Sequence, residues 1–275
     1  MAVTEVVAQR HVQGMQALLQ PSRLSMDFLD TASQSSTGRN APAVAKVLDP
    51  FAAGEPTPGS GSANALTAAV AAALITSVAK KTMHRQEPRY RPIQQLSTDI
   101  AARSEKLRTE LTELIEQDAL AFAPVIAHRL ATAGLIEEYR QDQSRRREIA
   151  FLKPATEIPI RIVEIAISIG TMAISMLEQG FQGAKGESYS ALTGAIAAAD
   201  GSLCVARLNV QAVQQRVKTL NDPKLEAFWL RSILTRIHAL RVASRPLRIR
   251  ETRFRRELQR SSQQPSRKQR VRVKR

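Results

Sequence analysis

The sequence predicts an all-α protein, an antiparallel bundle of long, alanine-rich helices. Hydrophobic residues make up 43% of the 275 residues but aromatic residues only 4%, so small aliphatic side chains dominate. Two stretches between residues 155 and 213 repeat apolar residues at spacings of three and four, the period of one helix face. Such a composition argues against a β-sandwich and is typical of closely packed helices.

The two central helices follow from their apolar positions. The first is apolar on nearly all of its faces, which indicates a central place in the fold. Its repeating positions are Ile158, Ile162, Ile165, Ile169, Met172 and Met176. Those of the second are Leu192, Ile196, Ala199, Leu203, Ala206, Val210 and Val213. Gly180, Gly183 and Gly186 lie between the two and allow the chain to reverse direction.

One acidic residue, Glu187, lies in this glycine-rich turn. A carboxylate at the start of a helix is stabilised in its ionised form by the helix dipole. An ionised carboxylate suits a proton acceptor better than a proton donor. We therefore predict that Glu187 is a catalytic carboxylate that faces a cavity between the helices.

The N-terminal part of the chain divides into an extension, a helix and a loop. Residues 1–22 form the extension, and they lack the charged start and apolar core of a secretory signal. Residues 23–32 predict a helix, and residues 33–58 predict a loop because they are rich in Ser, Thr, Gly and Pro. The longest apolar run, residues 65–79, is short for a membrane span, so we expect none.

A Gly- and Ser-rich segment comes directly before an alanine-rich helix. Gly59 and Gly61 allow a tight turn, and Ser62 is a good N-cap. The exposed N–H groups at such a helix start favour an anion or a ligand carbonyl. We predict substrate-binding roles for Gly59, Ser60, Gly61 and Ser62, with an ordinary capped helix as the alternative. A nucleotide-binding P-loop is excluded, because no Gly-Lys-Ser or Gly-Lys-Thr follows.

A long helix is predicted from Ile93 to about Leu130. Asp118 lies on its apolar face, between Leu114 and Ala121 in the repeat. An acid on a buried face is costly unless it is paired or solvated in a cleft. Asp118 is therefore a second candidate catalytic residue, with a structural hydrogen-bond acceptor as the alternative.

The C-terminal part contains two helices and a basic tail. Residues 134–153 predict a charged, exposed helix, and residues 223–240 predict the last helix of the core. The expected buried stripe of that last helix is Leu225, Phe228, Trp229, Ile233, Ile237 and Leu240. Residues 241–275 contain 14 Lys+Arg and 2 Asp+Glu, which accounts for most of the chain's net charge of +15. We expect this tail to be disordered and to contact an anionic partner weakly.

Residues for disulfide and metal chemistry are few. Cys204 is the single cysteine, so an intrachain disulfide cannot form, and its apolar surroundings predict that it is buried. His84 has no second His or Cys at ligand spacing, so we expect no metal site. A reduced, cytoplasmic setting is compatible with this composition.

Three segments carry a resemblance to a known family: PTPGSGS at 56–62, ATEIP at 155–159 and DGSLCVARLNV at 200–210. They resemble the P-T-P-G-G-G-S, A-T-x-V-P-L and N-x-R-x-N motifs of the cyclodeaminase/cyclohydrolase family. That family includes formiminotetrahydrofolate cyclodeaminase and a bacterial methenyltetrahydrofolate cyclohydrolase. Ser60 replaces the middle glycine of the first motif, and the acid of the family's glycine turn falls on Glu187.

The resemblance implies that residues 23–240 form the family's helical domain and that the protein is a homodimer. It implies an enzyme whose substrate is a one-carbon-substituted tetrahydrofolate, with no covalently bound cofactor. The reaction would be ring closure with loss of ammonia or hydrolysis of the methenyl bridge, and both need a carboxylate to move a proton. Lys81, Arg85 and Arg89, which follow the alanine-rich helix, would hold the glutamate carboxylates of the folate tail.

Departures from the family pattern leave two other interpretations open. Glu187 is one methylene longer than the family's aspartate, and residues 128–133 lack the lysine of the family's K-L-P-K loop, for which His128 or Arg129 is the available substitute. One alternative is a family member redirected to a non-folate substrate. The other is a non-catalytic helical scaffold that binds nucleic acid through residues 241–275.

Overall fold

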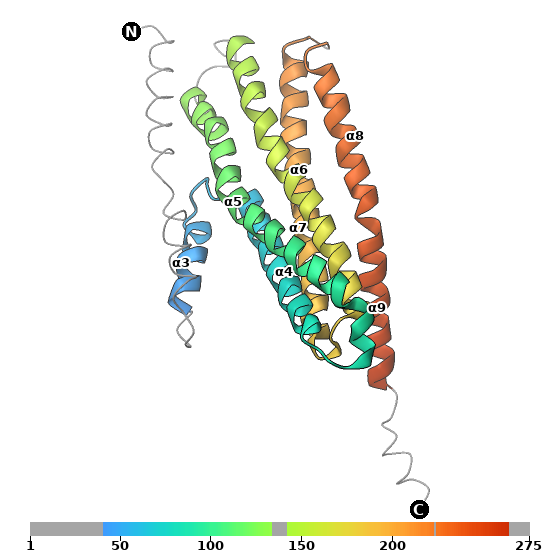
Figure 1. Cartoon of the computed structure of the whole chain (residues 1–275). Coiled ribbons are helices and arrows are strands. Elements are labelled where there is room, and N and C mark those ends of the chain that lie inside the picture. Colours follow the sequence, from blue (N-terminus) through green and yellow to red (C-terminus); the bar gives the residue numbers. More distant parts are fainter. Residues whose placement is uncertain (1–40, 134–141, 223, 264–275) are drawn as a thin grey trace, which may run out of the picture.

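The computed structural model describes residues 41–133, 142–222 and 224–263, and within these ranges every regular element is a helix. The predicted fold class is confirmed, because long helices lie side by side in a bundle (Figure 1). The elements are α3 (Ala41–Ala52), α4 (Ser60–Met83), η1 (Pro88–Ile93), α5 (Gln94–Thr132), α6 (Asp142–Gln179), η3 (Gln182–Ala184), α7 (Lys185–Thr219), α8 (Ala227–Ala243) and α9 (Arg245–Gln263). The predicted extension and the helix at 23–32 lie outside the described residues.

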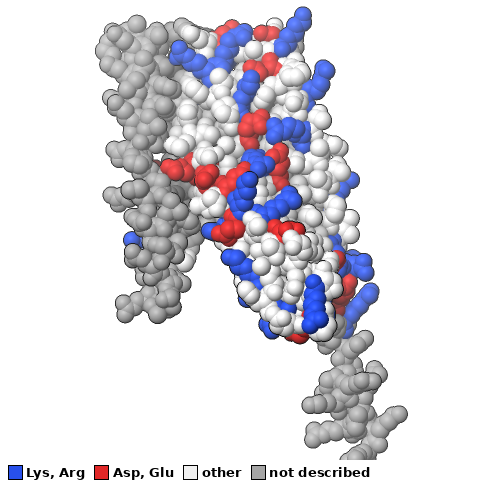
Figure 2. Space-filling view, in the orientation of Figure 1, with Lys and Arg blue, Asp and Glu red and all other residues white. Residues whose placement is uncertain are grey.

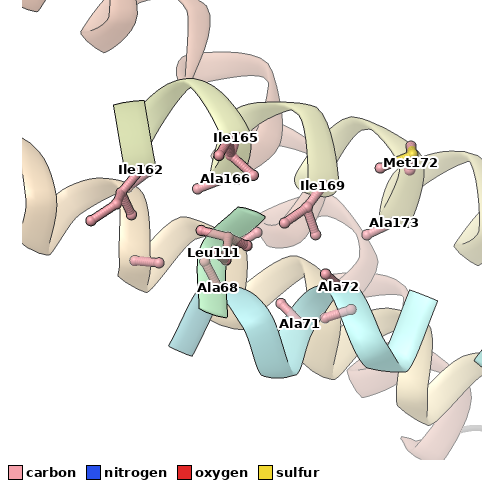
Figure 3. Packing of buried hydrophobic residues seen from close by; sticks show 14 of the residues in the cluster. Ala68, Ala71, Ala72, Leu111, Ile162, Ile165, Ala166, Ile169, Met172 and Ala173 are labelled. Carbon is pink, nitrogen blue, oxygen red and sulfur yellow. The ribbon is translucent and has the colours of Figure 1, made fainter. Parts of the chain in front are cut away.

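The core lies between α4, α5, α6 and α7. The most extensive contacts are between α6 and α7, and α4 packs on both α5 and α7. Ile162, Ile165 and Ile169 of α6 are at most 1% exposed, and Ile169 points toward α4 and Leu111 of α5 (Figure 3). Burying one such side chain contributes about 1.5–3 kcal/mol, so this stripe is a main source of stability.

Small residues bring α4 close to α7. Ala68, Ala71 and Ala72 of α4 are at most 1% exposed. A Cβ atom added at Gly194 of α7 would lie 3.4 Å from the Cβ of Ala71, and one added at Gly201 would overlap the side chain of Asn64. The alanine-rich composition is therefore used for close helix packing.

Residues 142–153, the described part of the charged helix predicted at 134–153, belong to one helix with the apolar stretch predicted from 155. From Asp142 onward, α6 runs through Pro154 and Pro159 to Gln179 without a break. A proline removes one backbone donor, which usually ends or kinks a helix. The carbonyl freed by Pro159 has a replacement donor, described with the site below.

Two predictions about order are wrong. The loop predicted at 33–58 contains α3, because its Ala-, Val- and Leu-containing middle has adequate helix propensity despite the flanking Ser and Gly. The basic tail is helical as far as Gln263, as α9. Leu247 and Phe254 of α9 are 2% and 7% exposed, and the Phe254 ring lies 5.4 Å from that of Tyr189. Apolar contacts therefore order α9, and residues 264–275 lie outside the described part.

Two burial predictions are also wrong. Cys204 is exposed, because the helical period turns Leu203 and Ala206 inward and leaves Cys204 on the outer face of α7. Phe228 of α8 is 88% exposed, whereas Ile233 and Ile237 of the same stripe are buried. α8 begins only at Ala227, so Phe228 lies at the helix end and not within its packed face.

Acidic and basic side chains alternate along one face of the bundle (Figure 2). Arg161 of α6 pairs with Glu110 of α5 at 2.6 Å and with Glu164 at 3.1 Å. Arg236 of α8 joins Glu157 at 2.7 Å and Glu164 at 3.2 Å. Ion pairs thus connect three helices across this face and neutralise one another.

By length and composition, α4, α6 and the segment Gln182–Thr219 are each apolar enough to cross a membrane. In the bundle, 50%, 61% and 44% of their most apolar windows are buried, which shows that much of this apolar surface packs within the protein. The absence of a membrane span, the homodimer and the domain boundaries at residues 22 and 240 stay predictions.

Candidate functional site

A cleft of about 420 Å³ lies at the N-terminal end of α4. Apolar side chains from α5 and α7 and a few polar groups form its walls, the usual composition of a small-molecule site. The lining residues are Pro56, Thr57, Gly59, Ser60, Gly61, Asp118, Phe122, Arg129, Ala155, Val205, Leu208, Asn209 and Ala212. The glycine-rich segment and Asp118, predicted separately, therefore meet in one place.

Ser62 of α4 joins the helix start to Asp118 of α5. Its Oγ lies 3.1 Å from Oδ2 of Asp118 and 2.8 Å from the carbonyl oxygen of Ile115. The backbone N–H of Ser62 also donates to the Asp118 carboxyl. The expected N-cap residue thus lies one turn inside the helix, where it binds another helix. Gly59 is the N-cap and makes no side-chain cap bond.

The pKa of Asp118 is raised, because burial disfavours the charged carboxylate more than the two hydrogen bonds from Ser62 favour it. The hydroxyl of Ser62 has one hydrogen and two acceptors within reach. Ser62 Oγ is the donor to both Asp118 Oδ2 and the carbonyl oxygen of Ile115, so its single hydrogen is shared between two acceptors. Burial therefore makes this carboxyl easier to protonate than an exposed aspartate.

Gly61 is required by the position of this carboxyl. It is buried, and a Cβ atom added there would overlap the carboxylate oxygens of Asp118. At Gly59, by contrast, an added Cβ would meet one backbone oxygen at 3.6 Å, an ordinary contact. Of these two glycines, Gly61 is the one that sterics demand.

Asn209 connects two of the sequence motifs. Its Nδ2 donates to the carbonyl oxygen of Ala155 at 2.9 Å. In an uninterrupted helix that carbonyl would accept from the N–H of residue 159, but residue 159 is a proline and has none. Asn209 therefore supplies the missing donor at the cleft wall.

Arg129 forms the far wall of the cleft. It lies on the same stripe of α5 as Asp118 and Phe122, because the spacings of four and seven residues return to one helix face. Its Nε donates to Glu148 of α6 at 3.0 Å, and Arg216 of α7 donates to the same carboxylate at 2.6 Å.

The other predicted site residues lie together at the opposite end of α4. Lys81 Nζ lies 3.0 Å from Glu187 Oε1, and both side chains are more than a third exposed. This hydrogen bond lowers the pKa of Glu187, so the carboxylate is ionised. The guanidinium of Arg85 stacks on Phe181 at 3.6 Å.

Arg89 similarly stacks on the ring of Tyr90, at 4.6 Å. A second, open hollow of about 480 Å³ lies beside Lys81 and His84. Ser62 and Lys81 are 19 residues apart in one helix, which corresponds to about 28 Å. Within one chain, the structure therefore does not bring Glu187 to the cleft of Asp118, as the sequence-based prediction expected.

Within the described ranges, no group of three or more His, Cys, Asp or Glu side chains is arranged to hold a metal ion. Sequence reasoning did not assign Phe122, Arg129 or Asn209 to the cleft; it raised Arg129 only as a substitute for the missing family lysine. The signals were present: two share the helix stripe of Asp118, and the third lies opposite a proline.

The comparisons with known proteins agree with this fold. A profile of the formiminotransferase-cyclodeaminase family matches residues 43–222. Methenyltetrahydrofolate cyclohydrolase of Methylorubrum extorquens is 29% identical over 133 residues, which are 48% of this chain and 62% of that protein. The crystal structure of formiminotetrahydrofolate cyclodeaminase from Thermotoga maritima superposes with a TM-score of 0.57 at 20% identity, over 76% of this chain and 92% of that one. The chain therefore belongs to the formiminotransferase-cyclodeaminase family.

Proposed function

We propose that the protein is an enzyme that acts on a one-carbon-substituted tetrahydrofolate in the cleft between α4, α5 and α7. The observation that carries this proposal is the contact between the family's glycine-rich segment and a buried carboxyl, Asp118, at the wall of a ligand-sized cleft. A folate substrate is supported by both relatives, a methenyltetrahydrofolate cyclohydrolase and a formiminotetrahydrofolate cyclodeaminase. A cytoplasmic, homodimeric enzyme is the corresponding expectation.

The two reactions named for these relatives pass through similar chemistry. In each, the one-carbon unit becomes a tetrahedral carbon that carries two ring-system nitrogens and one further group. Hydrolysis of the methenyl bridge places a hydroxyl there and then releases one nitrogen. Ring closure places an amino group there and releases ammonia. In both, the leaving nitrogen must gain a proton, so a carboxylic acid beside it promotes either reaction.

Asp118 has the properties of that acid. It is 9% exposed, and its raised pKa keeps a larger protonated fraction than an ordinary aspartate has. The N–H groups of Ser60 and Gly61 begin α4 beside it, and their helix dipole favours electron-rich ligand atoms. Phe122 and Leu208 provide the apolar wall that a ring system would contact.

The test is an absorbance assay of methenyltetrahydrofolate decay, together with ammonia release from formiminotetrahydrofolate. We expect wild type to catalyse one of them and Asp118→Asn to lower kcat by roughly 10²–10⁴-fold. Asp99→Asn is the matched control, because Asp99 is an exposed acid on the same helix. Absence of both activities in wild type would refute the proposed function.

Glu187 remains the second candidate for the proton-transfer carboxylate. Its lowered pKa suits a base, and its ion pair with Lys81 holds it at the other end of α4. A larger loss of kcat in Glu187→Gln than in Asp118→Asn would move the proton-transfer role to that end. This outcome would leave the proposed substrate unchanged.

A further inference from the structure

Arg129 lines a second, smaller cavity beside the cleft. This cavity has a volume of about 70 Å³, enough for a few water molecules or one carboxylate group. Its lining residues are all polar or charged and come from α5, α6 and α7. The lining residues are His128, Arg129, Thr132, Ser144, Arg145, Glu148, Arg216 and Thr219. Because Arg129 also lines the cleft, its guanidinium lies between the two spaces.

Glu148 holds Arg129 in this position. The Glu148 side chain is only 6% exposed, and it accepts from Arg129 Nε at 3.0 Å and from Arg216 Nε and Nη2 at 2.6 and 3.3 Å. A buried carboxylate needs such partners, since leaving it unpaired would be costly. Two guanidinium groups therefore converge on one carboxylate and leave an excess of positive charge.

Arg129 has donors left for a ligand. Among the described residues, Nε is the Arg129 atom that hydrogen-bonds to another side chain, and Nη1 and Nη2 make no such bond there. Its guanidinium carbon lies 5.9 Å from the centre of the Phe122 ring, which is also in the cleft wall. A guanidinium fixed through Nε presents its Nη atoms as a fork that suits a carboxylate.

The spacing along α5 fits an anionic arm of the cleft's ligand. Arg129 follows Asp118 by eleven residues, so their Cα atoms are separated by about 16 Å along the helix axis. Helical side chains lean toward the N-terminus, which brings the Arg129 guanidinium nearer to Asp118. In an extended folate, the first glutamate carboxylate lies about 10 Å from the one-carbon unit.

We propose that Arg129, positioned by Glu148 and assisted by Arg216, binds a carboxylate of the ligand in the cleft. This inference rests on the proposed function, under which that carboxylate belongs to the glutamate of the folate. It differs from the sequence-based expectation that Lys81, Arg85 and Arg89 hold the tail. Those residues lie at the other end of α4, and the two arginines there stack on aromatic rings.

The test compares methenyltetrahydrofolate with methenyltetrahydropteroyl amide, which lacks the glutamate and has no carboxylate. Arg129→Gln is expected to raise KM for the folate roughly 10- to 100-fold, because a charge-assisted hydrogen bond to the ligand is lost. It should change kcat less than about threefold, because that bond lies away from the reacting carbon. For the amide, wild type and variant should have equal KM. Arg103→Gln is the matched control, an exposed arginine on the same helix. A folate preference that survives in Arg129→Gln would overturn the inference while leaving the proposed function intact.

A binding experiment keeps the two proposals separable. Calorimetric titration with p-aminobenzoylglutamate and with p-aminobenzamide, which has no carboxylate, needs no turnover. A preference of wild type for the glutamate compound that Arg129→Gln abolishes supports the carboxylate subsite even if wild type catalyses neither reaction. Equal binding of the two compounds, or no binding of either, overturns it.

Discussion

Gly61→Ala tests whether the start of α4 and the Asp118 carboxyl are in contact. The added methyl group would overlap the carboxylate oxygens, so the carboxyl must move and give up its bonds to Ser62. Overpacking of this kind costs about 1–3 kcal/mol. Alanine regains about 0.5–1 kcal/mol because it loses less backbone entropy than glycine in a helix. With the hydrogen bonds to Ser62 also lost, at about 1 kcal/mol, we expect a net loss of about 1–3 kcal/mol.

Gly186→Ala is the matched control for this change. Gly186 is the second residue of α7, as Gly61 is of α4, but a Cβ atom added at Gly186 meets nothing within 4 Å. We expect this control to keep its stability or gain up to about 1 kcal/mol. Thermal denaturation followed by circular dichroism measures the difference. For a chain of this size, Gly61→Ala should lower Tm by roughly 3–10 °C.

The same overlap predicts a coupling between the two positions. In an Asp118→Ala background the carboxylate is absent, so the cost of Gly61→Ala should largely disappear. The Gly61→Ala variant alone should also lose activity in the methenyltetrahydrofolate assay, because its proton-transfer group is displaced. Equal Tm and equal kcat for Gly61→Ala and Gly186→Ala would refute the reasoning.

Two further predictions concern the hydrogen bonds around the cleft. Burial alone would raise the pKa of Glu148, but the hydrogen bonds from its two arginine partners outweigh burial and lower that pKa. The ionised Glu148 therefore stabilises the folded state above the unfolded pKa of 4.5. This stabilisation is lost as the pH falls through the lower folded pKa. Glu148→Gln should therefore lower the free energy of unfolding by roughly 1–3 kcal/mol at about pH 7 and much less at about pH 3 in urea titrations, and an equal loss at both would contradict this. Asn209→Leu should cost about 1–3 kcal/mol, because it leaves the carbonyl of Ala155 without a donor. In a Pro159→Ala background the N–H of residue 159 can serve that carbonyl, so Asn209→Leu should cost less there, and an unchanged cost in a double-mutant cycle would exclude this role.

Asp118 shows what a helical period can predict about a site. The repeat around Leu114 and Ala121 placed an acid on a buried face, and the structure buries that acid against Ser62. The same repeat includes Arg129. From the local sequence alone, however, an arginine at the end of a helix stripe that lines a cleft looks the same as one that faces solvent. Its role depends on Glu148, which another helix supplies.

The order of the basic tail was misjudged because it depends on residues far away in the chain. The basic tail is polar by composition, yet Leu247 and Phe254 recur at helical spacing and find apolar partners on the bundle. A Cβ atom at Gly170 of α6 would overlap the side chain of Leu247. Gly170, which is far from α9 in the sequence, therefore leaves the space in which Leu247 of α9 packs. Local composition does not report such complementarity.

The sequence by itself determined the helical class, the central pair of helices, and the glycine-serine start of α4, because periodicity and helix-start chemistry are local properties. Only the tertiary structure decided which acid shares a cleft with that start. Asp118 meets Ser62 across two helices, whereas Glu187 pairs with Lys81 about 28 Å away along α4. The two ends of a rigid helix are separated by its length. The direction and register of helix packing decide which end a side chain from another helix reaches.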